Sequence, residues 1–141
     1  MEVFRNTVYQ ISDKPAKTNM SGISETEIGP PPVYGGSPNS LNPEEMFVAS
    51  VNSCIMLVFY HFANKYEVEI ASYHSEAEGK VEKTKYGLRF TNVEVRAKVS
   101  LVSAESTAKI EEIAQLAERY CLVSGSLACP VQYNVEVVEN K

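Results

Sequence analysis

The sequence predicts a single α+β domain that spans residues 1–141. A length of 141 residues is typical of one domain, and 44% hydrophobic and 22% charged residues are close to the globular average. Stretches rich in β-branched and aromatic residues predict strands, and two apolar stretches predict helices. The predicted elements follow the order ββαββαβ, which indicates the α+β class.

The N-terminal part is predicted to hold two strands and a loop. Residues 2–11 predict the first strand and residues 20–28 the second, with residues 13–17 as the turn between them. Residues 29–38 are rich in proline and glycine, so we expect an extended loop with turns and no helix. Because this loop separates the two strands from the rest of the chain, they could pair with a second copy of the protein.

A well-marked helix should begin after this loop. Asn42 is a favourable N-cap, Pro43 suits the first helical position, and Glu45 stands where a capping-box acid belongs. The helix should extend to about Asn64. Its middle is apolar nearly all round, so we expect a buried central helix.

The second half of the chain predicts two long strands, a helix and a last strand. The long strands cover residues 66–82 and 86–102, and a change in the apolar alternation at Thr91-Asn92 predicts a β-bulge. Residues 104–120 have the apolar spacing of an amphipathic helix, residues 122–130 are irregular or a short helix, and residues 131–138 alternate as a strand does.

Composition argues against several classes of protein. The net charge of −5 is opposite to that of most proteins that grip nucleic acid, so we expect no nucleic-acid partner. The N-terminus has no apolar signal-peptide core, and the apolar run 54–60 is too short to span a bilayer. We therefore expect a cytoplasmic protein without a membrane partner. Two histidines and scattered cysteines do not make a zinc site.

The three cysteines carry the strongest functional signal. Cys54 lies midway along the first helix and Cys121 at the end of the second, both on apolar faces that should pack over the same sheet. Such a pair suits peroxide chemistry, because a thiolate can become a sulfenic acid that a second thiol converts to a disulfide. The alternative is that both are small core residues. For Cys129, which precedes Pro130, core packing is favoured.

Two blocks of residues point to a family. The first is the proline-containing loop with Gly35-Gly36, then Asn42-Pro43-Glu44-Glu45-Met46-Phe47, then a run of small residues that ends in Cys54. The second is Ala117-Glu118-Arg119-Tyr120-Cys121, followed by the strand 131–137. Over residues 29–137 the chain resembles the OsmC/Ohr family, the osmotically inducible and organic hydroperoxide resistance proteins.

The resemblance implies a fold, an activity and partners. The fold would be an intertwined homodimer, with long central helices packed against antiparallel sheets that both chains build. Cys54 would be the peroxidatic cysteine and Cys121 the resolving cysteine of a thiol-dependent peroxidase. Its substrates would be organic hydroperoxides and its reductant a dithiol, and no metal or bound cofactor would be needed.

The chain departs from the family at one position. The family activates its cysteine with an arginine that comes from the segment before the Asn-Pro-Glu block and is held by a glutamate matching Glu44. Here no arginine lies between Arg5 and Arg89, so Arg5 is the best substitute, with the partner chain as one source, and Lys14 is the next. Glu44 lies ten residues before Cys54, about 15 Å along one helix, and cannot touch that thiol directly.

The missing arginine leaves a second function open. The chain could be a non-enzymatic dimer of the same family that binds an apolar small molecule, with peroxidase activity weak or lost. His61 lies seven residues after Cys54, about 10 Å away, so a Cys–His dyad is not expected.

Overall fold

The computed structural model describes residues 1–139, which form two compact units, one of Met1–Phe47 and one that begins at Val48. Their elements are those of an α+β protein, which confirms the predicted class. The expectation of a single domain stays a prediction.

The first unit contains a small antiparallel sheet of three strands, not the two that the sequence predicted. The strands are β1 (Thr7–Tyr9), β2 (Ala16–Met20) and β3 (Ser24–Ile28), in the spatial order β1-β2-β3. Strand β2 is largely polar, so its pattern gave little signal. The turn from β2 to β3 depends on Ser21 and Gly22, which both have positive φ, as tight hairpin turns require.

Several apolar side chains of the first unit are exposed in the single chain. The residues before and directly after β1 lie outside any strand, so the predicted strand 2–11 is reduced to Thr7–Tyr9. The exposed fraction reaches 89% for both Phe4 and Ile23. Other large apolar side chains of this unit that are exposed are Met1, Val3, Val8, Tyr9, Ile11, Met20, Val33 and Tyr34.

The loop after β3 is less extended than the sequence predicted. A single 3₁₀ turn, η1 (Pro32–Tyr34), forms where no helix was expected. It ends at Gly35, whose φ of 90° suits glycine and few other residues. An isolated parallel β-bridge pairs Ile28, the last residue of β3, with Leu41, which lies just before the first long helix.

Helix α1 (Pro43–Lys65) begins where the capping residues predicted. The Glu45 backbone N–H donates to Asn42 Oδ1 at 2.7 Å, as an N-cap should. The sequence predicted a buried central helix, and in the single chain the burial of α1 is confined to one side. Only one stripe is buried, formed by Val51, Ile55, Phe59 and Ala63.

The opposite side of α1 stays open, and Leu57 there is 63% exposed. By length and composition α1 could cross a membrane, which the shorter run 54–60 did not suggest. The central helix of a soluble protein passes the same test, and 28% of the apolar window of α1 is buried in the single chain.

The second unit is built on a three-stranded sheet in the order β4-β5-β6. The strands β4 (Ile70–Thr84) and β5 (Gly87–Leu101) form a long antiparallel hairpin. Lys80 pairs with Asn92 and Val81 with Phe90, so Thr91 is the extra residue of the predicted bulge. Strand β6 (Val131–Val137) runs parallel to β5, which makes the sheet mixed instead of wholly antiparallel.

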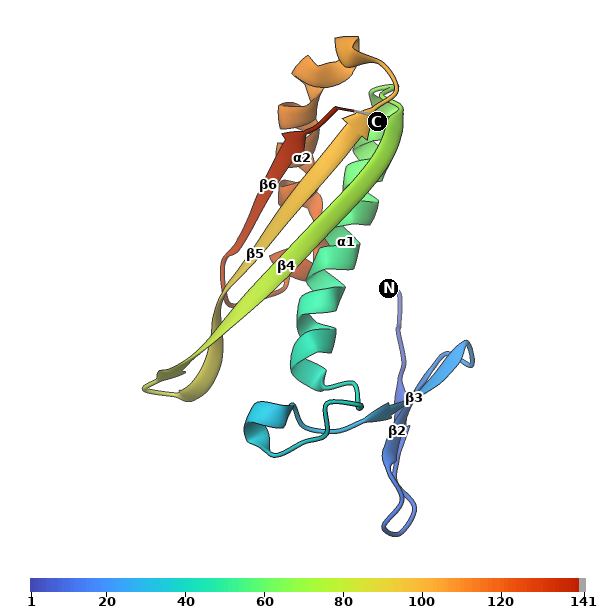
Figure 1. Ribbon diagram of the computed structural model, residues 1–141, viewed down its shortest axis with the longest axis vertical. Coiled ribbons are helices and arrows are strands. Elements are labelled where there is room, and N and C mark those ends of the chain that lie inside the picture. The colour runs from blue at the N-terminus through green and yellow to red at the C-terminus, as the bar shows by residue number, and fades with distance from the viewer. Residues whose placement is uncertain (140–141) are drawn as a thin grey trace. The chain divides into compact units, whose positions relative to one another are not determined.

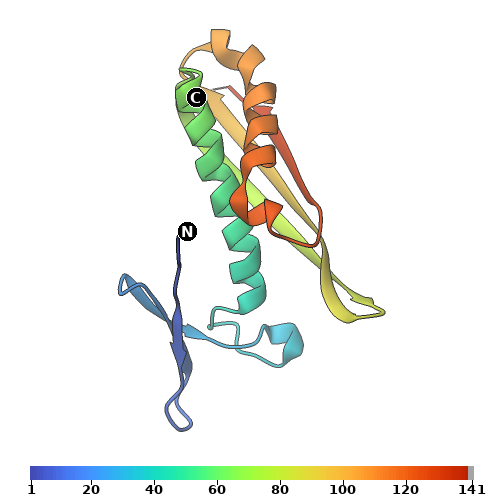
Figure 2. The same ribbon diagram turned by 180° about the vertical axis from the view of Figure 1, so that it is seen from behind.

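The parallel strand follows from the helical crossover between β5 and β6. This crossover contains η2 (Ala104–Ser106), α2 (Thr107–Tyr120) and the short α3 (Leu122–Gly125). Helices α1 and α2 lie side by side on one face of the sheet, as both views show (Figures 1 and 2). The core lies between them and the inward side chains of the strands, chiefly Val93, Val95, Ala97, Val99, Ile110, Ile113, Ala117 and Tyr133.

Candidate functional site

The structure brings Cys54 and Cys121 together. Cys54 lies midway along α1 and Cys121 directly follows α2, and their side chains are in hydrogen-bonding contact. Both cysteines are free thiols, and so is Cys129. Cys54 and Cys121 are 67 positions apart in the sequence, and the packing of α1 beside α2 brings them together.

The position of Cys54 is set by the buried stripe of α1. Val51 and Ile55 have no exposed surface and face the core. At 3.6 residues per turn, Cys54 projects from the flank of this stripe, and its contacts show that this flank faces α3. The thiol is half-buried, so small reagents from solvent can reach it.

Cys121 is held at a break between two helices. Its backbone is extended (φ −68°, ψ 111°), so it ends α2 and starts α3. Its carbonyl oxygen accepts from the Gly125 N–H at 3.0 Å and from Ser124 Oγ at 3.3 Å. Its side chain is 2% exposed. The break thus fixes a buried thiol at the point where the chain turns towards Cys54.

The surroundings of Cys54 disfavour its thiolate. Burial is the main cause that raises the pKa of the Cys54 thiol, and the neighbouring Cys121 adds to it. The backbone N–H groups of Val123 and Leu122 act in the opposite direction, because they donate to the sulfur. Among the residues that the structure describes, no cation contributes to this shift.

Arg5 and Glu44 belong to the first unit. Arg5 is exposed and precedes β1, while Glu44 is half-buried in the first turn of α1. The ion pairs among residues 1–139 involve neither side chain. Glu44 borders an apolar hollow whose other walls include Ile28, Pro31 and Tyr34. The catalytic roles of both residues stay predictions.

The remaining residues that the sequence analysis considered are not among the groups that shift the pKa of Cys54. His61 is exposed, and its ring meets the edge of the Phe62 ring at 5.1 Å between centroids. Cys129 is half-buried in the segment between α3 and β6, and it is not among the groups that shift the pKa of Cys54. No group of three or more potential metal ligands occurs within residues 1–139.

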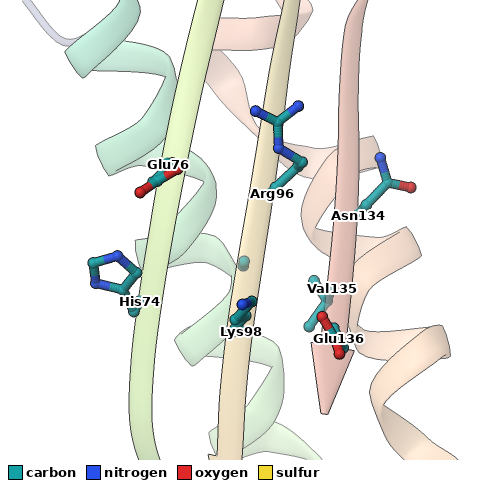
Figure 3. A pocket seen from close by; sticks show the side chains of 8 residues that line it. His74, Glu76, Arg96, Lys98, Asn134, Val135 and Glu136 are labelled. Carbon is teal, nitrogen blue, oxygen red and sulfur yellow. The ribbon is translucent and has the colours of Figure 1, made fainter. Parts of the chain in front are cut away.

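A polar hollow lies on the other face of the sheet (Figure 3). Its charged side chains come from all three strands, with Arg96 and Lys98 on the central one. Arg96 forms ion pairs of 3.0 Å with both Glu78 and Glu94, so its charge is already matched. The pair with Glu78 joins β4 to β5, and cross-strand charge pairs stabilise a solvated sheet face. We therefore place the candidate active site at the two cysteines.

Sequence reasoning missed the backbone contribution of α3. Residues 122–130 gave no clear periodicity. No glycine or proline marks the position at Cys121 where α2 ends and α3 begins. It also missed the part-buried hydrogen bond between Asn52 of α1 and Ser75 of β4, for which the sequence offered one amide within an apolar helix.

The fold and the site define an α+β protein in which two helices present a pair of free cysteines. The sequence profile described as OsmC-like protein matches residues 36–136. The chain therefore belongs to the OsmC-like family, which confirms the resemblance. No curated protein matches the sequence at a significant level.

Solved structures share the same fold over almost their whole length. An OsmC-like protein of unknown function from Vibrio cholerae has 25% identity and a TM-score of 0.85, with 96% of this chain and 100% of that chain covered. An organic hydroperoxide resistance protein OsmC from Legionella pneumophila has 17% identity, a TM-score of 0.74 and coverages of 97% and 98%. The organic hydroperoxide resistance protein OhrB of Bacillus subtilis has 20% identity, a TM-score of 0.63 and coverages of 96% and 98%.

Proposed function

We propose that the protein is a thiol-dependent peroxidase that reduces organic hydroperoxides through Cys54 and Cys121. The observation that carries this proposal is the direct contact of the two free thiols. Membership of the OsmC-like family supports it, as do the names of the structural relatives from Legionella pneumophila and Bacillus subtilis. A dithiol reductant in the cytoplasm would complete the cycle.

The reaction takes two steps. The Cys54 thiolate attacks the distal oxygen of the hydroperoxide, the O–O bond breaks, and the alkoxide leaves as an alcohol after it takes up a proton. Cys54 is then a sulfenic acid. The Cys121 thiol attacks the Cys54 sulfur, the S–O bond breaks, and a disulfide and water are formed. An external dithiol reduces this disulfide and returns both thiols.

Apolar surface beside the sulfur pair supports an organic substrate. Leu57, one turn after Cys54 on α1, is 63% exposed, and Leu122, next to Cys121, is 73% exposed. An apolar peroxide gains from covering such surface, whereas hydrogen peroxide does not.

We assign the activating cation to Arg5 of a second copy, held by Glu44. A thiolate nucleophile needs a favourable charge nearby, and the raised pKa of Cys54 leaves that need unmet within the described residues of one chain. Arg5 is an exposed guanidinium and Glu44 a half-buried carboxylate, and neither belongs to an ion pair of residues 1–139. The exposed apolar side chains of the first unit, such as Phe4 and Ile23, support a homodimer that would cover them.

The test is a thiol count after one equivalent of cumene hydroperoxide is added to the reduced protein. We expect the wild type to lose two of its three thiols, with the disulfide mapped to Cys54 and Cys121 by peptide mass spectrometry. Cys54→Ser should lose none, and Cys129→Ser, the matched control, should still lose two. Cys121→Ser should stop at a Cys54 sulfenic acid that dimedone captures. Normal peroxide consumption by Cys54→Ser would overturn the proposal.

A non-enzymatic dimer that binds an apolar small molecule is the second candidate. The observation that favours it is the raised pKa of Cys54, which would make a slow nucleophile if no cation reaches it. The hollow beside Glu44, with walls from Ile28, Pro31 and Tyr34, offers an apolar surface. Persistence of all three thiols in the presence of peroxide would favour this function.

A further inference from the structure

We propose that a chain of four hydrogen-bonded side chains fixes the rotation of α1 and thereby positions Cys54 for disulfide formation with Cys121. The chain, here called the hydroxyl chain, consists of Asn52 on α1, Ser75 and Tyr73 on β4, and Tyr133 on β6. This inference rests on the redox pair of the proposed function and assigns positioning residues to it.

The hydroxyl chain links β6 and β4 to α1. Ser75 Oγ donates to Asn52 Oδ1 at 2.7 Å, so its single proton is used there. The Tyr73 hydroxyl, two residues before Ser75 on the same strand, also contacts Ser75. The oxygens of Tyr73 and Tyr133 lie 2.7 Å apart and share one hydrogen bond. Hydrogen bonds connected in this way strengthen one another.

The sheet leaves room for the hydroxyl chain at one position on β5. On the central strand β5, Val99 pairs with Tyr73 and Val95 pairs with the other tyrosine, Tyr133. Between these two valines lies the small, buried Ala97, which pairs with Ser75. The two tyrosine side chains can therefore meet above Ala97, over the middle strand.

Aromatic packing holds the tyrosines against α1. The Phe59 ring, which has no exposed surface, lies 5.5 Å from the Tyr73 ring and 6.5 Å from the Tyr133 ring, centroid to centroid. A hydroxyl of the hydroxyl chain that lost its partner would have little access to water, because Tyr133 is buried. Polar groups in such a place favour the one arrangement that satisfies them all.

Asn52 and Cys54 lie on opposite flanks of the buried stripe of α1. At 3.6 residues per turn their side chains point about 160° apart, so one flank meets β4 while the other meets Cys121. A roll of α1 by about 20° would move a sulfur about 5 Å from the helix axis by about 1.7 Å. Disulfide geometry allows the two Cβ atoms to vary by only about 1 Å. The hydrogen bond from Ser75 to Asn52 therefore controls whether Cys54 and Cys121 can form a disulfide.

The experiment compares Ser75→Ala with wild type in glutathione redox buffers. One glutathione disulfide takes up the two electrons of the thiol pair and leaves as two glutathiones, while the Cys54–Cys121 bond forms by way of a mixed disulfide. We expect Ser75→Ala to lower the equilibrium constant of this disulfide at least about tenfold, and Ser75→Thr, which keeps the hydroxyl, to restore it. Tyr133→Phe removes the hydroxyl at the β6 end of the hydroxyl chain and keeps the aromatic ring, and it should also lower the constant.

Ser72→Ala is the matched control, because Ser72 lies on the same strand and its hydroxyl bonds Ser100 instead of α1. A purely structural role of Ser75 would lower the melting temperature of both alanine variants and leave the equilibrium constant unchanged, which would overturn the positioning role. A wild type that forms the disulfide with glutathione disulfide but not with peroxide would refute the peroxidase proposal alone. Failure to form it with either oxidant would overturn both.

Discussion

The Arg5→Ala substitution should raise the pKa of the Cys54 thiol and slow its reactions at neutral pH. In the single chain, burial raises this pKa and the described surroundings supply no cation to oppose the rise. If Arg5 of a second copy supplies that cation, its removal returns Cys54 to the surroundings that one chain provides.

The size of the effect follows from the charge and the burial. An ordinary thiol with a pKa of about 8.5 is about 3% ionised at pH 7. Because the pKa of Cys54 is raised in the single chain, the variant should hold a smaller fraction of thiolate than this. An opposite charge within about 4–6 Å shifts a pKa by about 1–3 units. The wild type should therefore hold at least about tenfold more Cys54 thiolate at pH 7 than Arg5→Ala.

The assay is the rate of alkylation of Cys54 by iodoacetamide between pH 5 and 10, followed at the Cys54 peptide by mass spectrometry. The midpoint of the pH profile gives the pKa of the Cys54 thiol in the wild type and in Arg5→Ala. The rate should rise with pH and level off above the thiol pKa, and it should level off at lower pH in the wild type. Arg89→Ala, which removes an exposed arginine from β5, should behave as the wild type does. Equal midpoints in the wild type and Arg5→Ala would refute the assignment of Arg5.

Two further predictions concern stability and are measured by urea unfolding. Asn42→Ala should lower the free energy of unfolding by about 1 kcal/mol, because the N-cap bond to the Glu45 N–H is lost; an unchanged value would contradict the capping role. Gly79→Ala should lower it by about 1–3 kcal/mol, since a Cβ there would lie 2.7 Å from both Phe90 Cε1 and Val48 Cγ2. A neutral Gly79→Ala would mean that those side chains move aside without strain.

The features that the sequence predicted well are local. Asn42, Pro43 and Glu45 marked the start of α1, and α1 begins at Pro43. The change of alternation at Thr91 marked the bulge, which the strand register contains. The alternation in residues 131–138 marked β6. Each depends on preferences of neighbouring residues, which a sequence displays directly.

The features that the sequence did not predict depend on residues far apart in the chain. Strand β2 is polar and is recognised by its pairing with β1 and β3. The parallel direction of β6 depends on the helical crossover that precedes it. The apolar middle of α1 predicted a buried central helix, but a single sheet can cover only one face of a helix.

The candidate site divides in the same way. The sequence by itself determined which residues have the chemistry, with Cys54 and Cys121 placed on two helices, and it determined the OsmC-like family. Only the tertiary structure decided that these two thiols meet, that the N–H groups of Val123 and Leu122 reach Cys54, and that burial raises its pKa. The physical reason is that helix rotation and packing are set by contacts across the whole core, so local preferences cannot specify which sulfur faces which.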